Sequence, residues 1–263
     1  MFLSPLFSGS SGNATAVEIG GVRLLVDAGK TCRCLENALQ CVGIPPETIQ
    51  ALFITHEHID HVRGAGVFSR RYDVPIYANA GTWEAMLPLI GEIAPKNTRV
   101  FSTDHGFFLK DAVVFPFKTP HDARESVGYR FSHGAHAMTV MTDIGHADPV
   151  LLEQAAGSDL VLIEANHDPE LVRSCRYPYV TKQRILSDRG HLSNEHAGRA
   201  LARLYTTGVR QAILAHLSRD NNFAELALST VREQLRLADI PDEAFSLTVA
   251  RREEATGVFQ VSE

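Results

Sequence analysis

The sequence predicts an α/β protein, in which strands and helices alternate before the chain turns into consecutive strands. Its 263 residues are 44% apolar, which is enough to bury a sizeable core. Short apolar runs bounded by glycine and proline predict the strands, and longer amphipathic stretches predict the helices. Because no repeat, low-complexity tract or linker interrupts the chain, we expect a single domain that covers residues 1–263.

The chain opens with a turn-rich loop, Ser8–Asn13, and a predicted hairpin. Two strand-like runs, Ala14–Ile19 and Val22–Val26, are joined by Gly20-Gly21, a dipeptide typical of tight turns. The loop before them has two interpretations. It is either only the entrance to the hairpin or a nest of backbone N–H groups that binds a terminal phosphate.

The segment Asp27-Ala28-Gly29-Lys30-Thr31 follows the second strand and opens a helix, as a phosphate-binding P-loop would. A P-loop also requires a glycine five positions before Gly29, where the sequence has Leu24 in the middle of a strand. We therefore reject nucleotide binding through this element. The helix runs to about Val42 and ends at Gly43, a typical terminator.

The most informative stretch is Thr55-His56-Glu57-His58-Ile59-Asp60-His61, which directly follows an apolar run. The run predicts a buried strand, so the histidines stand on the loop at its end, where sites are commonly built. In extended backbone, residues two apart face the same side, so His56 and His58 can face one ion. Asp60 and His61 would then turn toward another. Imidazole nitrogens and a carboxylate oxygen suit zinc, manganese or iron.

The rest of the chain continues the alternation and then changes to consecutive strands. Apolar, β-branched and aromatic runs predict strands at Ala51–Ile54, Val74–Ala78, Arg99–Ser102, Ala112–Lys118, Ser126–Phe131, Ala137–Thr142, Leu160–Ile163, Ala212–Ala215, Phe245–Ala250 and Val258–Val261. Helical patterns predict helices at Val62–Phe68, Thr82–Ile90, Asp148–Ala156, Ser193–Tyr205 and Phe223–Ala238. The hydroxyl of Ser193 is a suitable N-cap.

Three further polar residues stand directly after predicted strands, in the same placement as His56. They are His121, Asp143 and His216. Taken singly, each is typical of a turn-capping or surface residue. Taken with the first motif, they complete a set of six or seven potential metal ligands.

A basic segment interrupts a chain whose net charge is -6. The overall charge argues against attraction of the whole molecule to nucleic acid, but local patches decide binding. The longest irregular stretch is Asn166–Leu192, and within it, between Arg173 and Arg189, only Asp188 opposes a run of cations: Arg173, Arg176, Lys182, Arg184 and Arg189. Loops this long in compact domains are usually functional. Tyr177 and Tyr179 either stack on bases or anchor an ordinary solvated loop.

Composition excludes several other classes of protein. The N-terminus has no basic region followed by an apolar segment, and no window reaches the ~18 apolar residues of a membrane span. We expect a soluble cytoplasmic protein that binds no membrane. Four cysteines in a chain of this length do not form a disulfide scaffold. Cys34 and Cys41 lie among apolar residues of the first helix, so we expect buried free thiols there.

On these motifs the sequence resembles the metallo-β-lactamase superfamily, whose pattern is H-x-H-x-D-H followed by a histidine, an aspartate and a histidine. The resemblance extends from Ser8 to about Asn222. It implies a four-layer αββα sandwich, with two mixed sheets and helices on the outer faces. It also implies two divalent ions: one held by His56, His58 and His121, the other by Asp60, His61 and His216, with Asp143 bridging.

Narrower motifs resemble the YycJ (WalJ) group of exonucleases within that superfamily. They are Ser8–Asn13, Glu164–Asp168, Gly190–Asn194 and His216–Asn222. Gly190-His191 also resembles the second histidine motif of the β-CASP nucleases, although no insertion is long enough for a β-CASP domain. The diiron oxidoreductase branch resembles H-x-E-x-D-H, whereas this chain has His58 at that position. Hydrolysis is therefore favoured over redox chemistry.

The implied reaction is phosphodiester hydrolysis, as a 5′ to 3′ exodeoxyribonuclease. Two cations about 3.5–4 Å apart would lower the pKa of a shared water to give hydroxide near neutral pH, and would neutralise phosphate charge. Manganese or zinc is expected, with iron as a further candidate. We assign catalytic roles to Asp60 and to His191, which would contact the scissile phosphate or protonate the leaving oxygen. Expected substrate contacts are Arg176, Lys182, Arg184, Arg189, Ser10 and Asn13, and the expected partner is DNA rather than RNA.

Two other functions stay open. The first is a small-molecule hydrolase of the same fold, such as a cyclic phosphodiesterase or a thioester hydrolase, with the basic segment as a lid. The second is a metal-containing protein kept for partner binding, although a binding module does not need an open dinuclear site. The sequence leaves the oligomeric state undetermined.

Overall fold

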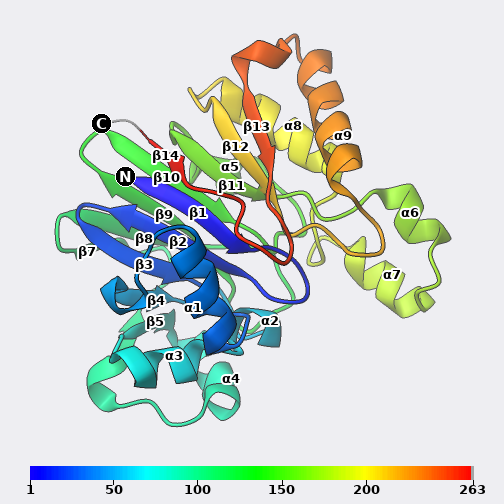
Figure 1. Ribbon diagram of the computed structural model, residues 1–263. Coiled ribbons are helices and arrows are strands. Elements are labelled where there is room, and N and C mark those ends of the chain that lie inside the picture. Colours follow the sequence, from blue (N-terminus) through cyan, green and yellow to red (C-terminus); the bar gives the residue numbers. More distant parts are fainter. Residues whose placement is uncertain (262–263) are drawn as a thin grey trace. The chain divides into compact units, whose positions relative to one another are not determined.

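A computed structural model describes residues 1–261, which divide into two compact units (Figure 1). Unit 1 comprises Met1–Lys118, Ala123–Ala135 and the chain from Arg251 onward, and unit 2 comprises Thr119–Asp122 and His136–Ala250. The strands belong to two mixed sheets that carry helices, which confirms the predicted α/β sandwich. The single domain of residues 1–263 stays a prediction.

The first sheet lies in unit 1 and has the strand order β14-β1-β2-β3-β4-β5-β6. The strands β3 to β6 run parallel, and β1, β2 and β3 are antiparallel. The predicted hairpin is confirmed, because Ile19 of β2 pairs with Val22 of β3. The strand bounds are β1 Phe2–Phe7, β2 Ala14–Ile19, β3 Val22–Val26, β4 Ala51–Phe53, β5 Ile76–Asn79, β6 Thr98–Phe101 and β14 Phe259–Gln260.

Helices cover one face of this sheet, and three antiparallel strands pack on the other. The helices of unit 1 are α1 Cys32–Cys41, α2 Ile59–Val62, α3 Ala65–Tyr72 and α4 Ala80–Ile90, with short 3-10 turns at Pro46–Thr48 and Pro95–Asn97. Leu35 of α1 and Phe68 of α3 belong to one buried cluster with Leu52 of β4. On the opposite face, the ring of Phe53 lies 5.4 Å from that of Tyr129. Tyr129 belongs to the antiparallel strands β7 Phe107–Leu109, β8 Ala112–Lys118 and β9 Val127–His133.

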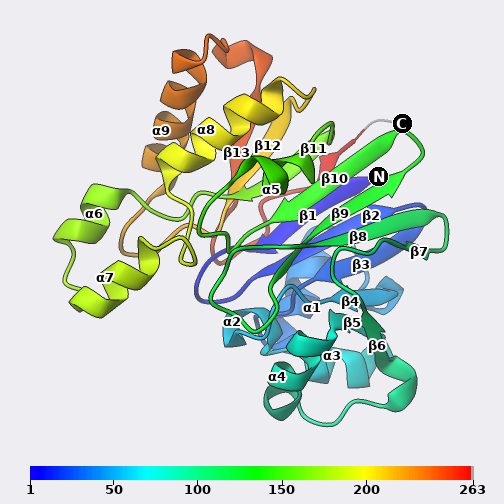
Figure 2. The same cartoon turned by 180° about the vertical axis from the view of Figure 1, so that it is seen from behind.

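Unit 2 is built on a parallel sheet with the strand order β13-β12-β11-β10. Its strands are β10 His136–Met141, β11 Leu160–Glu164, β12 Gln211–Ala215 and β13 Ser246–Val249. The helices α8 and α9 lie side by side along it (Figure 2). The helices are α5 Pro149–Glu153, α6 Pro169–Ser174, α7 Tyr179–Ile185, α8 Asn194–Tyr205 and α9 Ala224–Leu237, with a 3-10 turn at Asp242–Ala244. The predicted N-cap is confirmed, because Ser193 Oγ accepts from the backbone N–H of His196 at 3.2 Å.

Two local expectations were wrong, and one strand was missed. The stretch Asn166–Leu192 is not irregular, because α6 and α7 lie within it. The strand β1 was not predicted, since Pro5 interrupts its apolar run; the register with β2 shifts between Pro5 and Phe7. Cys34 and Cys41 are free but exposed. They fall outside the buried stripe of α1, which consists of Cys32, Leu35, Ala38 and Leu39.

No helix within residues 1–261 combines the length and the apolar character that a membrane crossing needs.

Candidate metal centre

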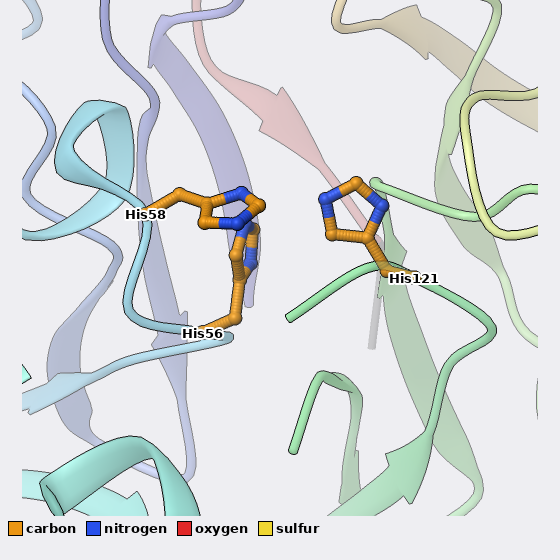
Figure 3. A group of neighbouring side chains, drawn as sticks. All are labelled: His56, His58 and His121. Atoms are coloured by element: carbon orange, nitrogen blue, oxygen red, sulfur yellow. The ribbon is translucent and has the colours of Figure 1, made fainter. Parts of the chain in front are cut away.

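The H-x-H-x-D-H motif begins on the loop at the carboxyl end of β4 in unit 1 and ends in α2 (Figure 3). The rings of His56 and His58 meet edge to face, with their centroids 4.6 Å apart. The ring of His61 lies 4.0 Å from that of His56. Asp60 Oδ2 lies 3.7 Å from His61 Nε2. The four candidate ligands of the motif therefore gather at one strand end, as the sequence predicts.

Asp27, at the end of β3, orients two of these imidazoles. Its Oδ2 atom accepts from His61 Nδ1 at 2.8 Å, and its Oδ1 atom accepts from the N–H of Thr55 at 2.9 Å. Thr55 Oγ1 donates to Asp27 and accepts from His56 Nδ1 at 3.0 Å. A proton held on Nδ1 leaves the lone pair on Nε2, which is the ring atom that would bind an ion. The sequence pattern marks Asp27 only as part of the rejected P-loop.

Close backbone packing joins the loop after β3 to the motif. A Cβ atom on Gly29 would lie 1.6 Å from the carbonyl oxygen of Asp60, so only glycine fits there. The N–H of Asn13 also donates to that oxygen at 2.8 Å. Gly29, which suggested a phosphate site in the sequence, instead allows the loop after β3 to pack closely against the motif.

The Ser8–Asn13 loop uses part of its backbone internally. The N–H of Gly9 donates to Asn13 Oδ1 at 2.8 Å, and the N–H of Gly12 donates to Gly9 O at 2.9 Å. Asn13 Nδ2 lies 3.0 Å from His61 Nε2, so this side chain contacts the motif directly. Ser10 is exposed. Phosphate binding by Ser10 and Asn13 stays a prediction.

Unit 2 contributes a second group of candidate ligands. Asp143, Glu164, His191 and His216 each offer one atom, and these atoms lie within 4.8 Å of one another. They come from the ends of β10, β11 and β12 and from the turn before α8. His121, on the loop after β8 (Figure 3), places its Nε2 atom 3.7 Å from Asp143 Oδ1. Unit 2 thus gathers all three of its predicted ligands with the predicted catalytic His191.

Glu164 is the central carboxylate of unit 2, and sequence reasoning assigned it no role. Its side chain is fully buried. Oε1 accepts from Nδ1 of both His191 and His216 at 2.8 Å, and Oε2 accepts from the N–H of Ile144 at 2.9 Å. Burial raises the pKa of Glu164, but the charge and hydrogen bonds of His191 and His216 outweigh it, so the pKa lies below its usual value. A glutamate closing the apolar strand Leu160–Ile163 was the available signal.

The loop of His121 is bonded to the turn before α8. His121 Nδ1 donates to Gly190 O at 3.1 Å. Arg189 donates to His121 O through Nε at 3.2 Å and Nη2 at 2.9 Å. Burial lowers the pKa of His121 and so favours the neutral imidazole that metal binding requires.

The basic segment has both internal and exposed members. Arg184 binds the carboxylate of Asp122, with Nη2 3.1 Å from Oδ1, and Lys182 Nζ donates to Arg173 O at 2.7 Å. Arg176 is exposed. Contacts of these cations with a substrate stay predictions.

The two tyrosines of this segment differ. Tyr177 donates its hydroxyl to Asp220, and this hydrogen bond raises the pKa of Tyr177 to about 12. Tyr177 therefore anchors the segment. Tyr179 is 75% exposed at the start of α7 and is the tyrosine placed to meet a ligand.

Three of the strand-end residues adopt the left-handed backbone conformation, which is unfavourable for residues other than glycine. Asp27, Asp143 and His216 have φ values of 62°, 54° and 56°. Such left-handed residues cost roughly 1–3 kcal/mol each and cluster at functional sites. The fold therefore accepts strain where the candidate ligands and their partners lie.

The donor set fits divalent metal ions. It consists of imidazole nitrogens and carboxylate oxygens, and the donated Nδ1 protons fix the histidine tautomers. Zinc, manganese and iron accept such ligands.

The chain is similar in sequence to several known proteins. The family model of the beta-lactamase superfamily domain matches residues 22–217. Exodeoxyribonuclease YycJ of Bacillus anthracis is 38% identical over 235 residues, which cover 89% of this chain and 89% of that protein. Exodeoxyribonuclease WalJ of Streptococcus pneumoniae is 38% identical over 239 residues, which cover 90% of this chain and 89% of that protein.

The fold is also found in solved structures. Zn(2+)-bound PqqB from Methylobacterium extorquens has a TM-score of 0.72 at 16% identity, covering 99% of this chain and 100% of that chain. At this identity the similarity shows the fold alone.

Proposed function

The chain belongs to the beta-lactamase superfamily and is a metal-dependent hydrolase, and on that premise we propose that it is an exodeoxyribonuclease that degrades DNA from the 5′ end. Membership confirms the resemblance predicted from the motifs. Two relatives at 38% identity, each aligned over 89% of its own length, are named exodeoxyribonucleases. The observation that carries the proposal is the oriented donor set, in which the Nδ1 atoms are committed to protein acceptors.

We also propose that residues 1–263 act as one domain. His56, His58 and His121 would hold one ion, and Asp60, His61 and His216 the other, with Asp143 bridging. Manganese and zinc suit these donors best, and iron is a further candidate. Divalent ions bound there would activate a water molecule and neutralise charge on the phosphodiester.

Two residues in the centre are more accessible than most of the buried ligands. The side chains of Asp60 and His191 are 21% and 19% exposed, whereas that of His61 is 0% exposed. His191 Nδ1 is held by Glu164, so Nε2 is the atom that would meet a substrate. We assign His191 to contact with the scissile phosphate or protonation of the leaving oxygen, typically worth ~10²–10⁴-fold in rate.

The basic segment supplies the proposed nucleic-acid contacts. Arg176 and Lys182 would neutralise backbone phosphates. Arg184 and Arg189, which also bind Asp122 and the carbonyl of His121, would add to this positive charge. Tyr179 would stack on a base. Ser10 and Asn13 would contact the terminal phosphate. Binding through phosphates weakens steeply as salt increases, because counterions are released on association.

The test is a cleavage assay with metal-replete protein on DNA labelled at the 5′ or the 3′ end, in single- and double-stranded form, with RNA in parallel. We expect stepwise loss of the 5′ label as mononucleotides, and no activity from the matched His58→Ala variant. Faster hydrolysis of a small phosphodiester or thioester, by orders of magnitude, would identify a small-molecule hydrolase instead. Release from the 3′ end would overturn the proposed polarity.

A further inference from the structure

We infer that Arg189 positions the loop that carries His121. This cation of the basic segment thereby helps to place a ligand of the proposed metal centre. The inference rests on the proposed role of His121 as a metal ligand. It assigns to Arg189 a role different from the phosphate contact that the charge pattern suggests.

Arg189 holds the backbone of the ligand itself. Its Nε and Nη2 atoms both donate to the carbonyl oxygen of His121, at 3.2 and 2.9 Å. Two donors of one planar guanidinium on a single oxygen fix both the distance and the direction of approach. A lysine ammonium offers the charge without this fork geometry.

The neighbouring residue holds the ring of the same histidine. Gly190 O accepts from His121 Nδ1 at 3.1 Å, which fixes the tautomer and aims Nε2 away from the turn. Two consecutive residues therefore hold the backbone and the imidazole of one proposed ligand. A shift of the turn at Arg189-Gly190 would move both together.

The turn is itself fixed by backbone packing. A Cβ atom on Gly190 would lie 2.1 Å from Arg184 O, and one on Gly145 would lie 2.2 Å from Asp188 O. Gly145 N in turn donates to Pro120 O at 2.8 Å, one residue before His121. The turn, the His121 loop and the loop after β10 are thus packed backbone to backbone, which makes the turn a rigid support.

An ion pair adds a further connection one residue along the chain. Arg184, on α7, binds both carboxylate oxygens of Asp122, the neighbour of His121. This pair is on the surface, and exposed pairs contribute little by themselves. We therefore place the positioning role mainly on Arg189, whose acceptor is the ligand's own carbonyl.

The test measures metal binding rather than cleavage. Metal-free Arg189→Ala, Arg189→Lys, His121→Ala and Arg176→Ala proteins are titrated with Mn²⁺, and absorption spectra are recorded with Co²⁺. We expect Arg189→Ala to weaken binding at the His121 ion about 10–100-fold, as loss of outer partners typically does, and to alter the Co²⁺ spectrum. Arg189→Lys should recover part of the affinity, because it keeps one donor. Arg176→Ala should keep wild-type affinity and spectrum.

DNA binding by the same variants, measured against salt without metal, separates the two roles. If Arg189 instead bound a DNA phosphate, Arg189→Ala would lower the salt slope by about one. A lower slope in Arg189→Ala, together with wild-type metal affinity and spectrum, would overturn the inference. Arg189→Met, which removes both the donors and the charge but keeps an aliphatic stem, gives the same decision should the alanine variant fold poorly. Wild-type metal affinity in His121→Ala would instead contradict the ligand assignment on which the inference rests.

Discussion

Buried carboxylates decide how the candidate ligands present their nitrogens. Asp27 in unit 1 accepts from His61 Nδ1 at 2.8 Å, and Glu164 in unit 2 accepts from His216 Nδ1 at the same distance. Each carboxylate also accepts a backbone N–H, so its own position is fixed. Both units therefore use the same device, a carboxylate that holds one imidazole nitrogen and directs the other.

Substitution of His191 should affect catalysis but not metal binding. We expect His191→Ala to keep its metal content and to lose about 10²–10⁴-fold in turnover, because the ring would act on the phosphate or the leaving group. Metal analysis and steady-state kinetics on the same preparation check this. Loss of an ion from His191→Ala would make the residue a ligand and would contradict the assignment.

Buried His167 makes stability depend on pH. Burial is the main cause that lowers its pKa from 6.5 to about 4. Between these values the unfolded chain binds a proton that the folded chain does not, so the free energy of unfolding should fall as pH drops from 6.5 toward about 4. The shift corresponds to roughly 3 kcal/mol at most.

Urea unfolding across that pH range tests the role of His167. His167→Gln should flatten the dependence, and exposed His105→Gln should leave it unchanged. An equal slope in wild type and His167→Gln would remove His167 as the source.

The residues that the sequence identifies are those whose signal is local. His56, His121 and His216 follow apolar strands directly and also match the order of the family's metal-ligand pattern, so position and pattern together mark them. Glu164 and Asp27 act through neighbours from other strands, and nothing within a few residues of either reveals those partners. Side chains whose role depends on tertiary contacts were therefore missed.

Loops after parallel strands carry the chemistry, and glycines let them approach one another. Gly29 allows the loop after β3 to meet Asp60 O, where a Cβ atom would lie at 1.6 Å. Gly190 does the same for the turn before α8, where the distance to Arg184 O would be 2.1 Å. The tight packing of these loops therefore helps to fix the positions of the candidate ligands.

Gly29→Ala should disturb the motif without altering any ligand side chain. Overlap with backbone cannot be relieved by a rotamer change, so we expect a loss of about 1–3 kcal/mol or more in the free energy of unfolding. Metal affinity should fall as well. Gly106→Ala is the control, because the nearest atom to its Cβ would be a Phe115 ring carbon at 3.2 Å. Equal stability and metal affinity in the two variants would contradict this account.

Elements with a buried face were predicted better than those without one. The helix α8 was predicted together with its cap, and β8 was predicted with both of its ends. The helix α7 has no buried residue, so no apolar stripe marked it in the sequence. The strand β1 is an exception, because it is mostly buried but contains Pro5, and proline is rare inside strands.

The chain as a whole has a negative net charge, but it contains a local basic segment. The net charge is -6, yet Arg173 to Arg189 holds five cations against Asp188. The arrangement predicts that nucleic acid meets this segment rather than the surface at large. The α/β character followed from the order of strands and helices, whereas the sandwich itself was implied only by the family resemblance.

Metal removal should destabilise the whole protein. Ions that bind only the folded chain stabilise it by mass action, so chelation should lower the Tm and added Mn²⁺ or Zn²⁺ should restore it. Differential scanning calorimetry measures both. His58→Ala should show a smaller shift than wild type. An unchanged Tm after verified metal removal would mean that the ions contribute nothing to folding.

Anomalous diffraction from crystals of the metal-replete protein tests the ligand assignment most directly. We expect two peaks about 3.5–4 Å apart, one bound by His56, His58 and His121, the other by Asp60, His61 and His216, with Asp143 contacting both. A single peak, or ions bound by residues of one unit alone, would contradict it.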